Sequence, residues 1–308
     1  MNRSGKLHAL LSTARVANIP SVVSNVWLGV VIGLFFGDFV VLEIPWNIAS
    51  RLALAGVTLY VAGNFFNDWM DRGWDASHRP ERALPRGLFR AGLYVSLASA
   101  LGVLGIGLAA FVNPRCALVA GIIAASICIY TLWHKRSAWA VIPMGLCRAL
   151  LPVMGYMAFQ PYLDGIWPAA GGLFCYIIGL SLSARHESMA EPPRRVVVMA
   201  RGLLLATAIL MAGQHKGFQP GLLMSLAGVL PYLAWTSFCL RFRKKPVSAL
   251  VSGLLAGIPW VDWIVLLPIF LSLASDGAGW IGFAVACFAI PPLAFVSALL
   301  LQRLAPAT

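Results

Sequence analysis

Charged residues are scarce in this chain of 308 residues. Only 11% are Asp, Glu, Lys or Arg, and the 11 acids are outnumbered by 23 cations. Hydrophobic residues make up 60%, against about 45–50% in soluble domains. The sequence therefore lacks the polar surface of a soluble protein. Long apolar runs recur from about residue 18 to the end, which predicts an all-α, polytopic transmembrane helical bundle.

Paired cysteines are also missing. The six cysteines stand singly in or beside apolar segments, with no CxxC and no paired spacing. A disulfide framework or a zinc site is therefore not expected, and the cysteines are interpreted as small residues in helix packing. We also find no polar linker or insert long enough to form a second domain, so residues 1–308 are expected to form a single domain.

The apolar residues divide into ten segments. They lie near residues 18–36, 50–66, 91–112, 116–133, 138–158, 166–184, 196–214, 219–239, 249–275 and 279–302. The ninth segment contains two glycines, two prolines and Asp262, so it is either one span, two half-helices or an interfacial piece. The bundle is therefore expected to have nine or ten helices. The two long polar loops are expected at about 67–90 and 185–195.

The net charge of +12 could suggest a nucleic-acid partner, but the distribution of charge argues against one. With a cytoplasmic N-terminus, all but four of the cations fall on the cytoplasmic side; the four are Arg51, Arg115, Arg148 and Lys216. The positive-inside rule accounts for this excess without an anionic polymer. The sequence therefore predicts a multi-pass protein of the cell membrane, with its N-terminus and its two long polar loops in the cytoplasm.

A polar run from residue 67 to 75 ends the second apolar segment. Asn67, Asp71 and Asp75 are spaced i, i+4, i+8, so a helix projects them from one face. Carboxylates are unfavourable at the C-terminal end of a helix, which argues against the alternative of ordinary polar capping. Oxygen ligands of this kind suit Mg²⁺ together with a substrate phosphate. We therefore predict that these three residues bind Mg²⁺.

An arginine-rich segment, Arg79-Pro80-Glu81-Arg82-Ala83-Leu84-Pro85-Arg86-Gly87, follows at once. Guanidinium groups match phosphate oxygens in a bidentate manner. The alternative is a loop that carries positive charge only for topology. Because the arginines come directly after the acidic run, the two together favour a site for Mg²⁺ and a diphosphate.

Three further features are candidates for the same chemistry. His134-Lys135-Arg136 forms a short cytoplasmic turn, which is either part of the site or simple topological charge. Arg148 lies inside the fifth segment, where a charge either faces a pocket or pairs with an acid or carbonyl. Glu187 and Glu191 are spaced i, i+4 after the sixth segment, and they hold a second Mg²⁺ or form a solvated helix end.

These motifs resemble those of the UbiA superfamily of intramembrane prenyltransferases. Asn67-x-x-x-Asp71-x-x-x-Asp75 matches its first aspartate-rich motif, and Arg79-Pro80-x-Arg82-x-Leu84-Pro85-x-Gly87 resembles the segment that follows. The order of the elements also agrees over nearly the whole chain. The resemblance implies that the first motif binds Mg²⁺-diphosphate and that the diphosphate is contacted by Arg82, Lys135 and Arg136.

The second family motif departs from its usual pair of aspartates. The corresponding loop contains Arg185, Glu187 and Glu191 instead. With Met144-Gly145-Leu146-Cys147-Arg148, this loop resembles the divergent EboC-type branch. At this position we predict Glu187 and Glu191 for metal binding, from their spacing, and Arg185 for binding of the diphosphate. The predicted catalytic residues are Asn67, Asp71, Asp75 and Glu187.

The predicted function is Mg²⁺-dependent transfer of a prenyl group from an isoprenoid diphosphate to an unidentified acceptor. Metal and arginines would stabilise the leaving diphosphate, and aromatic faces would stabilise an allylic cation; the aromatic candidates are Phe65, Phe66, Trp69, Tyr130 and Tyr176. The alternatives are a non-catalytic or transport-type membrane protein, a degenerate enzyme on the same fold, and an enzyme acting on another phosphorylated lipid. Membrane lipid is expected around the bundle, with no obligate protein partner.

Overall fold

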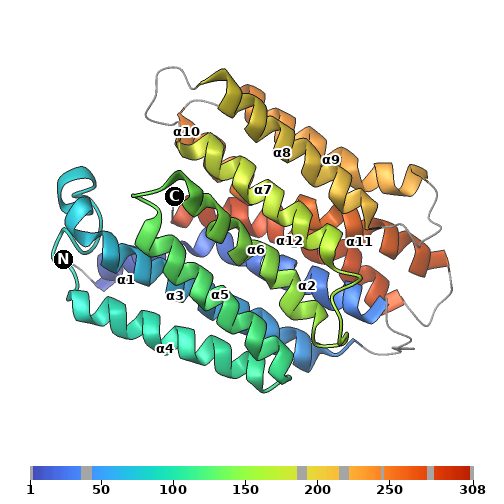
Figure 1. Ribbon diagram of the computed structural model, residues 1–308, viewed down its shortest axis with the longest axis horizontal. Helices are drawn as coiled ribbons and strands as arrows, with labels where there is room; N and C mark the ends of the chain where they lie inside the picture. The colour runs from blue at the N-terminus through green and yellow to red at the C-terminus, as the bar shows by residue number, and fades with distance from the viewer. Residues whose placement is uncertain are drawn as a thin grey trace.

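A computed structural model describes residues 3–35, 44–185, 193–214, 222–243, 246–275 and 281–305. All regular secondary structure in these ranges is helical, without any strand. Figure 1 shows the long helices lying side by side, roughly along one direction. The predicted all-α bundle is confirmed.

Apart from α1, which precedes the first predicted segment, the helices follow the apolar segments of the sequence closely. In the first half of the chain they are α1 (Arg3–Thr13), α2 (Ile19–Phe35), α3 (Trp46–His78), α4 (Ala91–Ala110), α5 (Pro114–Trp133) and α6 (Val141–Tyr156), with short 3₁₀ turns at Val16–Asn18 and Ala138–Ala140. In the second half they are α7 (Trp167–Arg185), α8 (Arg194–Gly213), α9 (Leu222–Phe242), α10 (Val247–Ala256), α11 (Ile258–Ser275) and α12 (Ile281–Leu304). The ninth predicted segment is two helices, α10 and α11, which meet at Gly257.

In the part of the chain that the structure describes, eight helical stretches are long and apolar enough to cross a membrane, and α10 with most of α11 counts as one of them. Two shorter apolar helices cover Val141–Tyr156 and Leu226–Phe242. The longest stretch is α3, with 33 residues, which is about 50 Å at 1.5 Å per residue. Because a bilayer core is only about 30 Å thick, one end of α3 extends beyond it.

The C-terminal part of α3 carries the polar motif. The sequence predicts a polar loop over 67–90, and this prediction is wrong for its first part, because α3 continues without a break to His78. The helix remains intact there because its acidic side chains are held by cations from other segments, as described below. The loop is therefore shorter than predicted, and the polar motif lies on rigid helix.

Helix α2 lies at the centre of the bundle and α4 at its edge. Thirteen of the seventeen residues of α2 are buried, compared with four of the twenty residues of α4. Small residues bring α2 and α6 very close. A Cβ on Gly29 would lie 1.9 Å from the Pro152 carbonyl oxygen, and one on Gly155 would lie 2.4 Å from that of Val26. Such close approach of backbones is typical of helix packing in membranes.

The arginine-rich segment folds back over the end of α3 and the start of α4. Its backbone closes tight turns, with the Arg86 amide donating to the Arg82 carbonyl and the Leu88 amide to the Ala83 carbonyl, at 3.1 Å each. Gly87 takes a left-handed φ of 66°, which glycine adopts at little cost. Ala83 is buried in a small apolar cluster with Phe65 and other residues. This packing holds the segment so that Arg82 lies over α3.

Candidate active site

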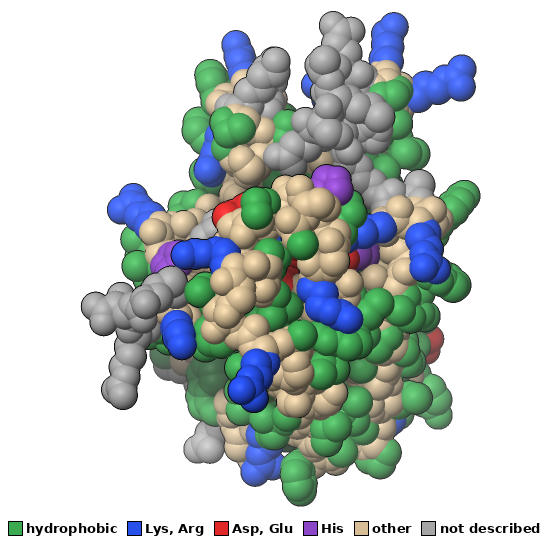
Figure 2. Space-filling model, turned by 90° about the vertical axis from the view of Figure 1, so that its left-hand side faces the viewer, with side chains coloured by type: hydrophobic (Ala, Val, Ile, Leu, Met, Phe, Trp, Pro, Cys, Tyr) green, Lys and Arg blue, Asp and Glu red, His purple; other side chains and the backbone are tan. Residues whose placement is uncertain are grey.

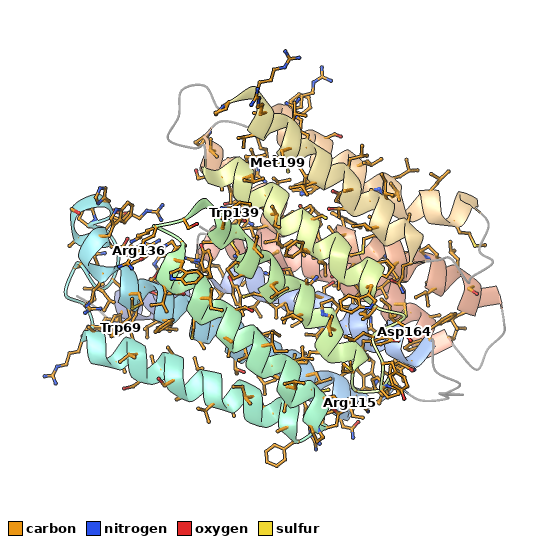
Figure 3. The ribbon with its side chains drawn as sticks, in the orientation of Figure 1. Trp69, Arg115, Arg136, Trp139, Asp164 and Met199 are labelled. Atoms are coloured by element: carbon orange, nitrogen blue, oxygen red, sulfur yellow. The ribbon has the colours of Figure 1, made fainter. Side chains whose placement is uncertain are left out.

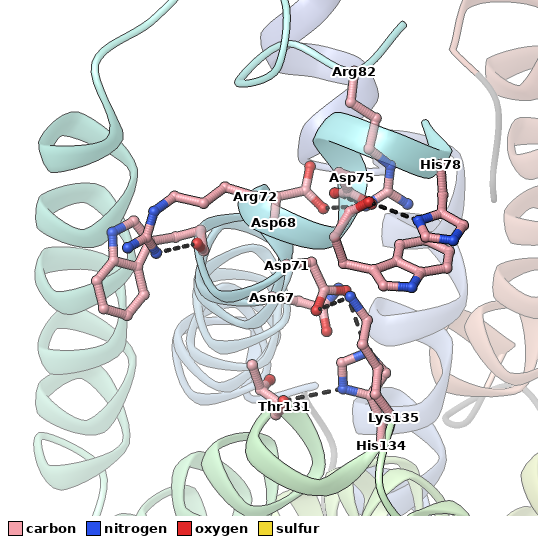
Figure 4. A network of polar contacts seen from close by, with 12 residues as sticks. Asn67, Asp68, Asp71, Arg72, Asp75, His78, Arg82, Thr131, His134 and Lys135 are labelled. Atoms are coloured by element: carbon pink, nitrogen blue, oxygen red, sulfur yellow. Dashed lines mark hydrogen bonds and ion pairs between the residues drawn. The ribbon is translucent and has the colours of Figure 1, made fainter. Parts of the chain in front are cut away.

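The three polar residues of the first motif share one face of α3, as their spacing predicts. Asp71 and Asp75 are 8% and 1% exposed. The Asn67 amide donates a hydrogen bond of 3.3 Å to Asp71 Oδ2. Figure 4 shows these side chains in one row above the end of α5. Two nearly buried carboxylates so close together require positive partners.

Asp71 finds its partners at the end of α5. Lys135 Nζ lies 2.6 Å from Asp71 Oδ1, and His134 Nε2 lies 3.2 Å from Asp71 Oδ2. The other ring nitrogen of His134 is 3.0 Å from the Thr131 carbonyl oxygen, which orients the imidazole. The Lys135 ammonium also lies 4.3 Å from the centroid of the Trp74 ring, a cation–π arrangement. The predicted Lys135 therefore does lie at the first motif.

Asp75 and Asp68 share Arg82. Arg82 Nη1 donates to Asp75 Oδ2 at 2.9 Å and to Asp68 Oδ1 at 3.2 Å. Arg15 also contacts Asp68, with its Nη2 atom 3.9 Å from Asp68 Oδ1. Arg15 is the one non-glycine residue with positive φ among those the structure describes, at 48°. Its backbone carbonyl accepts a hydrogen bond of 3.4 Å from Tyr60, which helps to hold this costly conformation.

Several buried oxygen atoms at this site have unused bonding capacity. Asn67 Oδ1 and Asp75 Oδ1 are buried without a hydrogen-bond partner, and so is Thr131 Oγ1. Orphaned oxygens are rare in protein interiors, and amide and carboxylate oxygens are the ligands that Mg²⁺ prefers. The first motif therefore fits Mg²⁺. Within the described ranges, no three His, Cys, Asp or Glu side chains cluster as a metal site.

The structure describes the other predicted site residues only in part. Arg136 is exposed beside Lys135, and it forms no ion pair with any acid that the structure describes. Helix α7 ends at Arg185 at the same end of the bundle as the first motif (Figure 1). The side chain of Arg185, and Glu187 and Glu191, lie outside the described residues.

The aromatic candidates are divided between site and core. Tyr130 stacks on His134, with ring centroids 5.1 Å apart, and so lies beside Asp71. Phe65 packs against Tyr94. Tyr176 is fully buried and donates to the Leu254 carbonyl. The sequence interpretation missed Trp74, although it lies inside the quoted motif.

Positive charge gathers around this end of the molecule. Figure 2 views it from outside, with Lys and Arg side chains around the rim. Figure 3 places Trp69 and Arg136 at this end, and Arg115 and Asp164 at the opposite end. The sequence interpretation counted Arg15 only as topological charge, and no motif signal distinguishes it from its neighbours. Its contact with Asp68 depends on the tertiary structure.

Comparison with known proteins identifies the family. The sequence model of the UbiA prenyltransferase family matches residues 26–191, which is more than half of the chain. This chain belongs to the UbiA prenyltransferase family. Protoheme IX farnesyltransferase of Aeromonas salmonicida (strain A449) is 36% identical over 152 residues, covering 47% of this chain and 50% of the relative. Digeranylgeranylglyceryl phosphate synthase of Thermococcus kodakarensis is 30% identical over 226 residues, covering 70% of each.

Solved structures support the same UbiA fold. A UbiA homolog from Aeropyrum pernix K1 superimposes with a TM-score of 0.57 at 14% identity, over 93% of this chain and 98% of that chain. A structure of digeranylgeranylglyceryl phosphate synthase gives 0.53 at 18% identity, over 96% and 99%. The chain spans about half the length of the first curated relatives it matches. The family and the apolar helices together make it a multi-pass membrane protein.

Proposed function

We propose that this UbiA family member transfers a prenyl group from an isoprenoid diphosphate to an acceptor, and that it requires Mg²⁺. The observation that carries the proposal is the meeting of Asp71 and Asp75 with Lys135 and Arg82 at one end of the bundle. A neutral solute would need neither charge. A metal-bound diphosphate needs both, because the carboxylates hold the cation and the basic groups hold the phosphate oxygens.

The residues divide the task by charge. Asn67, Asp71 and Asp75 would hold Mg²⁺ through their oxygens, and Lys135, Arg82 and Arg136 would bind the diphosphate. Arg185, Glu187 and Glu191 are proposed to complete the site from the end of α7 and the residues that follow it in the sequence. When bound, Mg²⁺ would neutralise negative charge on the leaving group. Lys135 and Arg82 would stabilise the charge that grows on the diphosphate as its bond to the allylic carbon breaks.

The bundle itself supplies the rest of the mechanism. The carbon–oxygen bond of the donor breaks, inorganic pyrophosphate leaves, and the acceptor attacks the allylic carbon and loses a proton. The face of Tyr130, beside His134, is suited to stabilise the allylic cation. Apolar helices around the site would exclude water and hold the isoprenoid chain. We place the site on the cytoplasmic side of the cell membrane, because the basic residues gather at that end.

The names of the relatives suggest which donors to test first. One relative is named a farnesyltransferase and the other a digeranylgeranylglyceryl phosphate synthase. We therefore propose farnesyl and geranylgeranyl diphosphate as donors. The acceptor stays open.

The deciding experiment compares Asp71→Asn and Asp71→Ala with the unmodified protein. Purified protein in detergent is incubated with farnesyl or geranylgeranyl diphosphate, Mg²⁺ and a panel of acceptors, and pyrophosphate release is measured. Binding of the non-hydrolysable S-thiolodiphosphate analogues is measured alongside. Both variants are expected to lose release and binding, and so is the unmodified protein in EDTA. Asp164→Asn, an exposed acid at the opposite end, is the control. Near-normal turnover in the Asp71 variants would refute the proposal.

A further inference from the structure

A second polar cluster lies inside the bundle, away from the first motif. It joins Asn25 and Ser24 of α2, Arg148 of α6 and Asp262 of α11. Arg148 is 8% exposed, and the other three are fully buried. Burying four polar side chains in an apolar bundle costs free energy, and such residues inside a membrane often mark a functional site.

Hydrogen bonds hold this cluster in a fixed order. Ser24 Oγ donates to Asp262 Oδ2 at 2.5 Å, and the Asn25 amide donates to both Asp262 oxygens at 2.9 Å. The Asn25 Oδ1 atom then accepts from Arg148 Nη1 at 3.0 Å. Asn25 thus uses both ends of its amide, which positions the guanidinium of Arg148.

The backbone reinforces this alignment. Helices α2 and α6 run side by side, with Gly29 of α2 facing Pro152 of α6 and Gly33 facing Tyr156. Asn25 and Arg148 lie one turn earlier on each helix and share the same offset in sequence. Close contact at Gly29 therefore fixes the distance from α2 to Arg148. The arginine side chain has little freedom to relax.

The guanidinium nevertheless keeps unused donors. An arginine has five N–H groups. Among the described residues, Arg148 donates a hydrogen bond only to Asn25 Oδ1. Its charge also faces the Tyr60 ring, with Cζ 5.6 Å from the centroid. Arg148 is 8% exposed, and none of its nitrogens is among the buried polar atoms without a partner. Its remaining N–H groups are therefore accessible to an oxygen-bearing group.

The N–H groups of Arg148 lie deeper in the bundle than the first motif. Tyr60 is on the same helix as Asn67, seven residues earlier, which corresponds to about 10 Å along the axis. Arg148 therefore lies beneath the first motif by roughly the length of a small molecule. A diphosphate held at Asp71 would leave the guanidinium of Arg148 to bind a second substrate.

We propose that Arg148 anchors the acceptor of the prenyl group, by donating hydrogen bonds to carboxylate or hydroxyl oxygens of a small polar molecule. This inference rests on the proposed function, because it assigns a second substrate to the same reaction. Asn25 and Asp262 are positioning residues, which hold the guanidinium ready. Planar guanidinium recognition of this kind is poorly replaced by lysine.

The test measures acceptor binding without requiring turnover. Protein in detergent, with Mg²⁺ and geranylgeranyl S-thiolodiphosphate, is titrated calorimetrically with 4-hydroxybenzoate as the carboxylate probe and with myo-inositol as the hydroxyl probe. The same titrations are repeated without the donor analogue. The unmodified protein is expected to bind at least one probe. Which probe binds distinguishes a carboxylate acceptor from a polyol.

Two variants of Arg148 then test the acceptor site separately from the proposed prenyl transfer. Arg148→Met is expected to weaken probe binding at least tenfold and Arg148→Lys to weaken it less, while both keep the affinity for the donor analogue. Arg115→Met, an exposed arginine at the opposite end, serves as the matched control. If neither probe binds the unmodified protein, or if Arg148→Met binds it equally well, the acceptor site is overturned. Failure of the donor analogue to bind the unmodified protein would instead contradict the proposed function.

Discussion

The Lys135 ammonium lies 2.6 Å from the Asp71 carboxylate and joins the end of α5 to the motif on α3. In the proposed reaction these two groups act on opposite charges, Asp71 on the metal and Lys135 on the diphosphate. The two groups also form an ion pair with each other, as do Arg82 and Asp75. Because the charges are balanced, the site can keep carboxylates and cations close together inside a helical bundle.

Lys135 should matter for donor affinity more than its neighbours do. Lys135→Met removes a charge-assisted contact, worth about 1.5–3 kcal/mol, or roughly tenfold to hundredfold in affinity. We expect this loss in the dissociation constant of the S-thiolodiphosphate donor analogue, measured by calorimetry. Arg72→Met removes an equal charge from an exposed neighbour on α3 and should have little effect. Equal losses in the two variants would mean that Lys135 acts only through general positive charge.

Arg82 is expected to be needed for stability as well as for binding. It bonds both Asp68 and Asp75, and Arg82→Met leaves the buried Asp75 without its cation. The expected cost is about 1.5–3 kcal/mol of unfolding free energy for each lost bond to a charged group. Arg82→Lys should lose less, since one ammonium can still reach one carboxylate. Thermal unfolding in detergent measures the difference, with the exposed Arg79→Lys as control. An unchanged midpoint in Arg82→Met would show that the ion pair is not stabilising.

Gly29 tests how closely α2 and α6 must pack. The added Cβ of Gly29→Ala would lie 1.9 Å from the Pro152 carbonyl oxygen, so the two backbones must separate. Overpacking of this kind costs about 1–3 kcal/mol, and the displaced α2 should also weaken acceptor binding at Arg148. Gly102→Ala in α4 has open space around its Cβ and is expected to be neutral or slightly stabilising. Similar thermal midpoints for the two variants would contradict the close packing.

The two glutamates that follow α7 in the sequence give a separate prediction, which rests on the sequence alone. Glu187→Gln should raise the Mg²⁺ concentration needed for half-maximal pyrophosphate release by about tenfold or more, as expected for loss of a metal ligand. Glu191→Gln should have a similar effect. Glu81→Gln, an exposed acid in the arginine-rich segment, is the control. If Glu187→Gln leaves the Mg²⁺ dependence unchanged, the second motif does not bind metal.

Local periodicity in the sequence was enough to determine the fold and the first motif. Apolar runs of sufficient length become membrane helices because the bilayer leaves the backbone no other way to satisfy its hydrogen bonds. The helical period likewise puts Asn67, Asp71 and Asp75 on one face wherever the helix lies. The break at Gly257 was one of the alternatives left open by the glycines and prolines of that segment.

Tertiary structure alone decided which charges meet. Asp71 pairs with Lys135 and His134 because α5 ends beside α3, and Arg15 reaches Asp68 because of a left-handed turn before α2. The partner of Arg148 could not be chosen from the sequence, because Asn25 and Asp262 are more than a hundred residues away from it in opposite directions. Hydrophobic patterning specifies that a helix is buried, but a contact between two buried polar groups depends on how whole helices pack.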